Sequence, residues 1–220
     1  MRVLNSKPTV TIIDYGASNL ISVARAFEHL GIQTQMSDSP YDITHATHLV
    51  LPGVGAFGKA MEALIKRKLV EPIIEYCLKK RPFIGICLGM QMMLEYGREF
   101  GDHKGLGLIA GEVAPIPRTG EDRKPHKIPN VGWRSLVPHS ANRVWDNTIL
   151  HEITLKSAVY FTHSFRVIVG KESDRLADSF YNGIDICSVI KSGNMYGCQF
   201  HPEKSGPVGL KILRNFCYIE

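Results

Sequence analysis

PFIGICLGMQMMLEY, at residues 82–96, decides the fold class of this chain. The apolar run Phe83–Ile86 predicts a short buried strand, and the Met- and Leu-rich stretch Leu88–Tyr96 predicts a helix that follows it almost without a loop. Cys87 stands between the two, with a glycine two positions away on each side. This G-x-nucleophile-x-G spacing is typical of a nucleophile elbow, a strained turn from strand to helix that presents one reactive side chain.

The elbow would also supply chemistry. The amides and the positive dipole end of the predicted helix point at Cys87 and favour its thiolate, and the amide of Leu88 becomes an oxyanion donor. The alternative interpretation is an inert buried cysteine at a Gly-rich strand end. That is the default for the four cysteines at 77, 187, 198 and 217, which have apolar surroundings.

Outward from the elbow, predicted strands and helices alternate through the first half of the chain. Strands are expected at Val10–Ile13, Ile32–Met36 and His48–Leu51, and helices at 20–30, 56–68 and 70–80. In the second half, strands at Ala158–Thr162, Ile184–Ile190 and Met195–Phe200 are separated by turn residues and suggest hairpins, before a closing helix at Pro207–Tyr218. The pattern predicts an α/β fold with a mostly parallel, mixed central sheet flanked by helices.

Size and composition set the class of protein. With 220 residues, 44% of them hydrophobic, the chain fits one globular domain, which we place at residues 9–220 after a short N-terminal extension, residues 1–8. The net charge of +5 comes from interspersed residues and does not favour nucleic-acid binding. No run approaches the roughly 20 apolar residues of a membrane span, and residues 1–16 do not form a signal peptide. Five scattered cysteines without CxxC spacing favour a reducing cytoplasmic compartment and exclude a zinc knuckle.

A cysteine nucleophile needs a base and an acceptor that orients the base. Among nine histidines, His201 stands apart because His201-Pro202-Glu203 follows an apolar strand. Residues two apart in an extended segment share a side, so Glu203 can hold one imidazole nitrogen while the other faces Cys87. An isolated HPE could equally be a strand-end turn. The glycines of Gly53-Val54-Gly55 follow another predicted strand, where a Gly-rich turn can aim amides at an oxyanion.

These residues resemble the class I, triad-type glutamine amidotransferases. The longer motifs resemble, in particular, the glutaminase subunits of imidazole glycerol phosphate synthase. They are IDYG at 13–16 with NL at 19–20, LPGVGAFG at 51–58, GICLGMQ at 85–91, IPNVGW at 128–133, YFTHSF at 160–165 and QFHPEKSG at 199–206. The resemblance spans nearly the whole chain after the first eight residues.

The resemblance implies that Cys87 attacks the glutamine side-chain amide, that His201 shuttles protons and that Glu203 orients His201. The backbones of Val54, Gly55 and Leu88 would form the oxyanion hole. Glutamine would be bound by Gln91, Glu99, His163, Ser164 and Phe165. The resemblance implies no cofactor and no metal.

A partner also follows from the resemblance. Ammonia would pass to a (βα)₈-barrel synthase, or cyclase, subunit in a heterodimer, which forms imidazole glycerol phosphate and aminoimidazole carboxamide ribotide in histidine biosynthesis. Trp133 and Lys204 would lie near the subunit interface. The motifs predict no nucleic-acid or membrane partner.

The chain departs from the commoner family pattern at several positions, including Asn130, where histidine is usual, and Arg134, where asparagine is usual. We expect both positions in regions that contact the partner. Three alternatives therefore stay open: a paralogue that feeds ammonia to surface-sugar biosynthesis, another class I glutaminase of aromatic or nucleotide synthesis, and a non-enzymatic binding module.

Overall fold

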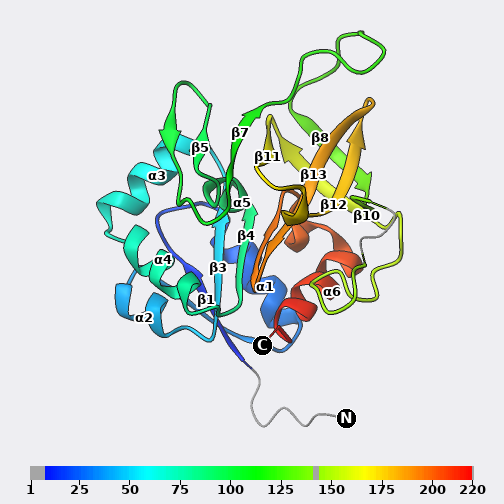
Figure 1. Ribbon diagram of the computed structural model, residues 1–220. Helices are drawn as coiled ribbons and strands as arrows, with labels where there is room; N and C mark the ends of the chain where they lie inside the picture. Colours follow the sequence, from blue (N-terminus) through cyan, green and yellow to red (C-terminus); the bar gives the residue numbers. More distant parts are fainter. Residues whose placement is uncertain (1–7, 141–143, 220) are drawn as a thin grey trace.

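The computed structural model describes residues 8–140 and 144–219, so the predicted extension lies, apart from Pro8, outside the described residues. An eight-stranded sheet forms the centre of the molecule, in the order β2-β1-β3-β4-β14-β13-β12-β9 (Figure 1). Its strands are β1 (Thr9–Ile13), β2 (Gln33–Ser37), β3 (His48–Gly53), β4 (Phe83–Cys87), β9 (Val137–Pro138), β12 (Arg175–Tyr181), β13 (Ile184–Ser192) and β14 (Met195–Cys198).

The sheet is mixed, as predicted. The first five strands in this order, from β2 to β14, pair in parallel, whereas β13, β12 and β9 continue the sheet in antiparallel fashion. Because β14 is antiparallel to β13 and parallel to β4, its carboxyl end lies beside that of β4. Carboxyl ends of neighbouring parallel strands are where ligand sites form in open α/β sheets.

Helices cover both faces of the parallel part. On one face, α1 (Leu20–His29) packs beside α6 (Gly206–Phe216), and the rings of Phe27 and Phe216 are 6.5 Å apart. On the other lie α2 (Pro40–His45), α3 (Phe57–Lys66), α4 (Val70–Leu78) and α5 (Leu88–Met92), which share a second core (Figure 1). Strands with apolar residues on both faces explain the near-continuous hydrophobic runs in the first half of the sequence.

Two small sheets stand above the central one. β8 (Asn130–Ser135) pairs antiparallel with β10 (Ala158–His163), and β11 (Phe165–Val169), β7 (Gly111–Pro115), β5 (Tyr96–Gly97) and β6 (His103–Lys104) form a four-stranded sheet. Short 3₁₀ turns occupy Glu172–Asp174 and Pro202–Lys204. No helix within the described ranges has the length and apolar character needed to cross a bilayer.

Strand β12 was not predicted from the sequence. Its interior holds Asp178 and Ser179, which are typical of turns, yet both are buried. Arg175 Nε donates to Asp178 Oδ1 at 2.7 Å, and Ser188 Oγ donates to Ser179 Oγ at 2.9 Å. One partner on the same strand and one on the neighbouring strand therefore satisfy polar groups that in isolation favour a turn.

Candidate active site

Cys87 ends β4 with φ 54° and ψ −109°, a backbone conformation that a residue with a side chain rarely adopts. The flanking glycines are required by close packing. A Cβ on Gly89 would lie 1.7 Å from the carbonyl oxygen of Leu51, and a Cβ on Gly85 would lie 2.7 Å from the carbonyl carbon of Gly89. The turn thus has the geometry of the predicted nucleophile elbow.

The helix after the elbow is shorter than predicted. We expected a helix over Leu88–Tyr96, but α5 ends at Met92. The carbonyls of residues 92–95 accept hydrogen bonds from the amides of residues 105–109 instead of continuing the helical ladder. The helix after Cys87 is thus short, and any effect of it on the thiol comes from the amides of its first turn, including that of Leu88.

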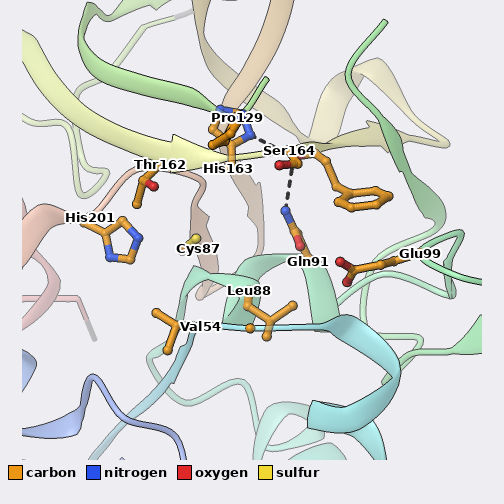
Figure 2. Close-up of a pocket in the computed structure, with 12 residues that line it drawn as sticks. Val54, Cys87, Leu88, Gln91, Glu99, Pro129, Thr162, His163, Ser164 and His201 are labelled. Carbon is orange, nitrogen blue, oxygen red and sulfur yellow. Dashed lines mark hydrogen bonds between the residues drawn. The ribbon is translucent and has the colours of Figure 1, made fainter. Parts of the chain in front are cut away.

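His201 and Glu203 form a buried pair next to Cys87. Nδ1 of His201 lies 2.7 Å from Oε1 of Glu203, and both side chains have no exposed surface. Figure 2 shows the His201 ring turned toward the sulfur of Cys87. His201 and Cys87 are 114 residues apart in the sequence, and the parallel pairing of β14 with β4 brings them together.

The charges of this pair support each other. Burial by itself opposes the imidazolium, but interactions with Cys87 and Glu203 outweigh burial and raise the pKa of His201. Burial likewise opposes the carboxylate, but hydrogen bonds from His201 and Asn19 lower the pKa of Glu203. A thiol, an imidazole and a carboxylate therefore stand in a row, which is the arrangement that activates a cysteine nucleophile.

Asn19 belongs to this group, although the sequence analysis gave it no role. Its Nδ2 donates to Oε1 of Glu203 at 2.6 Å, and the residue is buried at the start of α1. The motif NL at 19–20 was the available signal, but no spacing rule connects it with Glu203, which is 184 residues away.

A cavity of about 330 Å³ opens above Cys87, within the usual size range of small-ligand pockets. All predicted oxyanion and glutamine-binding residues line it, as do Cys87 and His201 (Figure 2). Its walls are Val54, Gly55, Cys87, Leu88, Gln91, Glu99, Pro129, Thr162, His163, Ser164, Phe165 and His201. Pro129 and Thr162 were not predicted.

Glu99 contributes a carboxylate to the far wall of the cavity. Its Oε2 accepts the amide of Phe57 at 2.6 Å, which fixes the carboxylate at the N-terminal end of α3. In Figure 2 the carboxylate points toward Gln91 and the cavity. The cavity therefore has the predicted nucleophile at one end and a carboxyl group at the other.

The predicted oxyanion segment follows β3 and borders the elbow. Gly53 pairs with Cys87 in the sheet register. A Cβ on Gly53 would lie 2.7 Å from Oη of Tyr15, which donates to the carbonyl of Pro52 at 3.0 Å. Gly55 has φ +100°, so a small change at this residue can redirect the amides of the segment.

Asn130 does not lie where we expected. It is fully buried on β8, and its Nδ2 lies 2.9 Å from Nε2 of His163, a residue of the cavity wall. Nδ1 of His163 donates to the carbonyl of Phe165 at 2.7 Å, so Nε2 must accept from Asn130 and the ring is neutral. Burial is the main cause that lowers the pKa of His163 to about 4. The departure at Asn130 thus concerns the interior of the site and not the outer surface.

Neutral His163 should make stability depend on pH. Its pKa is about 4 in the folded protein and 6.5 ordinarily, so between these values only the unfolded chain binds the proton, and the free energy of unfolding falls as pH falls. From about pH 7 to about pH 5 this contribution is about 2 kcal/mol. Urea unfolding at both pH values should show that, between about pH 7 and about pH 5, the free energy of unfolding of His163→Gln falls by about 2 kcal/mol less than that of the wild type. The exposed control His29→Gln should lose as much as the wild type, and equal losses in all three proteins would contradict the assignment.

Trp133 and Lys204 lie on one rim of the molecule. Trp133 is 51% exposed on β8 and contacts the ring of Tyr160 edge-on, with centroids 5.9 Å apart. The amide of Tyr160 donates to Oγ of Ser205, the neighbour of exposed Lys204. The predicted interface residues are therefore grouped beside the buried His201–Glu203 pair.

The family description of class I glutamine amidotransferases matches residues 11–219 of the chain. The chain belongs to this family. Among curated members of the family, it is 52% identical to imidazole glycerol phosphate synthase subunit HisH 1 of Legionella pneumophila (strain Lens), over 96% of this chain and 99% of the relative. It is 40% identical to subunit HisH of Geobacillus sp. (strain WCH70), over 96% of each chain.

Two solved structures share the fold of this chain at low sequence identity. PurLQS from Thermotoga maritima superposes with a TM-score of 0.73 at 18% identity, covering 98% of this chain and all of that one. A further glutamine amidotransferase superposes with a TM-score of 0.71 at 13% identity, over 95% and 97% of the two chains. The α/β architecture with its mixed sheet is thus that of the class I amidotransferases.

Proposed function

We propose that the chain is the glutaminase subunit of an imidazole glycerol phosphate synthase and acts in the cytoplasm. The observation that carries the proposal is the meeting of the Cys87 elbow with the buried His201–Glu203 pair at one end of a cavity sized for an amino acid. The relationship to the HisH subunits supports the assignment to histidine biosynthesis.

In this mechanism Sγ of Cys87 attacks the side-chain carbonyl carbon of glutamine. The amides of Leu88 and of the Val54–Gly55 segment stabilise the oxyanion. His201 gives its proton to the departing nitrogen. Ammonia is released, and a glutamyl thioester remains on Cys87. His201 then takes a proton from water, which attacks the thioester and releases glutamate.

The wall of the cavity across from Cys87 would bind the substrate. Gln91 and the 163–165 segment would hold the glutamine backbone and side chain, while the Glu99 carboxylate suits the α-ammonium group. The Glu99 carboxylate lies across the cavity from Cys87. This arrangement favours an amino acid that binds with its α-ammonium group at Glu99 and its side chain toward Cys87.

The partner would be a (βα)₈-barrel cyclase subunit docked as a heterodimer on the rim formed by Trp133 and Lys204. Ammonium is not a nucleophile, so a closed path between the subunits delivers the reactive free base. Coupling hydrolysis to the acceptor site also avoids loss of glutamine. We expect the Gly53–Gly55 segment to be the part that responds, since Gly55 can change conformation at little cost.

The proposal is tested by co-purifying the chain with the cyclase subunit and measuring glutamate release. We expect low turnover by the chain alone and a rise of about 100-fold with the cyclase and its acceptor nucleotide, the upper part of the usual range of coupling between sites. Equal turnover with and without the partner would contradict the coupling. Stimulation by a sugar-pathway barrel instead of the histidine-pathway cyclase would redirect the ammonia to surface-sugar synthesis.

Removing the side-chain amide of Asn19 should impair the orientation of Glu203 but leave the His201–Glu203 hydrogen bond in place. Asn19→Ala deletes the donor to Oε1 of Glu203 and leaves a buried carboxylate with one partner fewer, so we expect kcat to fall about 10-fold to 100-fold with little change in KM. Asn215→Ala is the matched control, because the side-chain amide of Asn215 is also a donor, but to the backbone carbonyls of Ile149 and His151. Similar kcat values for the two variants would rule out a role for Asn19 in orienting Glu203.

A further inference from the structure

The carbonyl of Phe165 sets the direction of a buried hydrogen-bond network. It accepts from Nδ1 of His163 at 2.7 Å and from Nε2 of Gln91 at 3.2 Å. A carbonyl oxygen can only accept, so the amide nitrogen of Gln91 must face it. The orientation of the Gln91 side chain is thereby determined, with its nitrogen turned into the protein (Figure 2).

The same nitrogen determines the orientation of the next residue, Gln199. Nε2 of Gln91 also lies 3.1 Å from Oε1 of Gln199, and with Gln91 as donor that oxygen is the acceptor. The amide nitrogen of Gln199 must then point the other way. It lies 3.9 Å from Sγ of Cys87.

Gln199 has little freedom to leave this position. It is fully buried, and its backbone amide donates to the carbonyl of Ser188 at 2.9 Å. Turning its side-chain amide over would place two amide nitrogens against each other at Gln91 and an oxygen against the sulfur. Both contacts are unfavourable, since they remove two hydrogen bonds from a buried region.

We propose that Gln199 is a further catalytic residue, which donates an N–H hydrogen bond to Cys87 Sγ and stabilises the thiolate before attack. The inference rests on the proposed glutaminase function. His201 lies on one side of the sulfur and must release its proton during the reaction, whereas the Gln199 amide keeps its hydrogen throughout. At 3.9 Å the contact is weak for a neutral thiol, and it strengthens with the negative charge of a thiolate.

The chemical advantage is that a fixed N–H donor holds the sulfur charged and in place until it attacks the substrate. Once the thioester has formed, the sulfur carries no charge and the hydrogen bond weakens. The donor therefore favours the thiolate over the acylated enzyme, and it acts mainly on formation of the nucleophile.

The test measures the reactivity of Cys87 directly, without glutamine and without a partner. Iodoacetamide labelling of the peptide that carries residue 87 is followed by mass spectrometry as a function of pH, with Cys87→Ala as the background. Gln199→Met removes the donor at similar volume, and Gln199→Glu keeps the acceptor for Gln91 but places a carboxylate oxygen against the sulfur. The exposed residue Gln33 on the edge strand β2 supplies the control, Gln33→Met.

We expect the midpoint of the labelling curve to rise by about one pH unit in Gln199→Met, which is about 10-fold slower labelling below the midpoint. In Gln199→Glu the midpoint should rise further, and in Gln33→Met it should not change. Midpoints equal to the wild type in folded Gln199 variants would overturn the proposal, even if the variants were less stable, because a structural role alone would not change the charge on sulfur. If Gln199→Met does not fold, Gln199→Glu decides by the same criterion.

The two proposals fail in different ways. If the complex hydrolyses glutamine but the labelling midpoint is unchanged in the Gln199 variants, only the proposed role of Gln199 is wrong. If the midpoint follows Gln199 but no partner or acceptor elicits glutamine hydrolysis, the proposed function is wrong and the activated thiolate remains.

Discussion

Replacing Cys87 with alanine is expected to lower glutamine hydrolysis by the complex at least 10⁴-fold, roughly the loss seen when one member of a catalytic triad is removed. The remaining groups can polarise the substrate but cannot form the thioester. Synthesis from added ammonium salts at alkaline pH should continue at the wild-type rate, because that reaction takes place in the partner. Glutamate release and product formation are measured in parallel with either nitrogen source.

Cys77→Ala is the matched control for Cys87. Cys77 is also a buried thiol, but it lies on α4, and burial raises its pKa to about 12, so it stays protonated. We expect wild-type activity from this variant with both nitrogen sources. Glutamine-dependent synthesis that survived in Cys87→Ala would refute the proposed nucleophile and the glutaminase function with it.

A single methyl group at Gly89 is expected to have the second largest effect. Its Cβ would lie 1.7 Å from the carbonyl oxygen of Leu51, so α5 must move away from β3. We expect Gly89→Ala to lower the free energy of unfolding by about 3 kcal/mol, the upper end of the usual cost of overpacking. Because the shift displaces Sγ of Cys87 and the amide of Leu88, kcat should also fall about 100-fold.

Gly193→Ala separates packing from backbone strain in this experiment. Gly193 has φ +58° in the turn between β13 and β14, and a Cβ there would meet no atom within 4 Å. The substitution should cost about 1 kcal/mol and leave kcat unchanged. Urea unfolding and glutaminase assays of both variants provide the comparison, and equal effects would show that close packing at the elbow is not the cause.

The position of Asn130 changes how the departures from the family pattern are interpreted. We expected it to bear on the choice of partner, but it binds His163 inside the cavity wall and helps to fix that ring as neutral. It therefore gives no support to a partner other than the cyclase. Arg134, in contrast to buried Asn130, is partly exposed on β8. Its guanidinium lies over the ring of Tyr181, 5.0 Å from the ring centroid.

Elements and residues whose causes are local could be predicted from the amino-acid sequence. The alternation of apolar strands and amphipathic helices predicted the parallel half of the sheet, and the glycines around Cys87 predicted the elbow because no other residue fits so tight a turn. The resemblance to the amidotransferases implied the oxyanion and glutamine-binding residues that line the cavity, because the motifs fix the position of each one along the chain.

Tertiary structure alone decided the features that depend on distant partners. Beyond the main part of α5 the carbonyls of residues 92–95 accept from the amides of residues 105–109, so the helix stops at Met92. Oδ2 of Asp178, buried on β12, lies 2.8 Å from Nδ1 of His139, which is 39 residues away. The same holds for Asn19 beside Glu203 and for Gln199 beside Cys87. A hydrogen bond between residues more than 100 positions apart leaves no periodicity in a single sequence, so only the folded chain reveals which side chain faces the nucleophile.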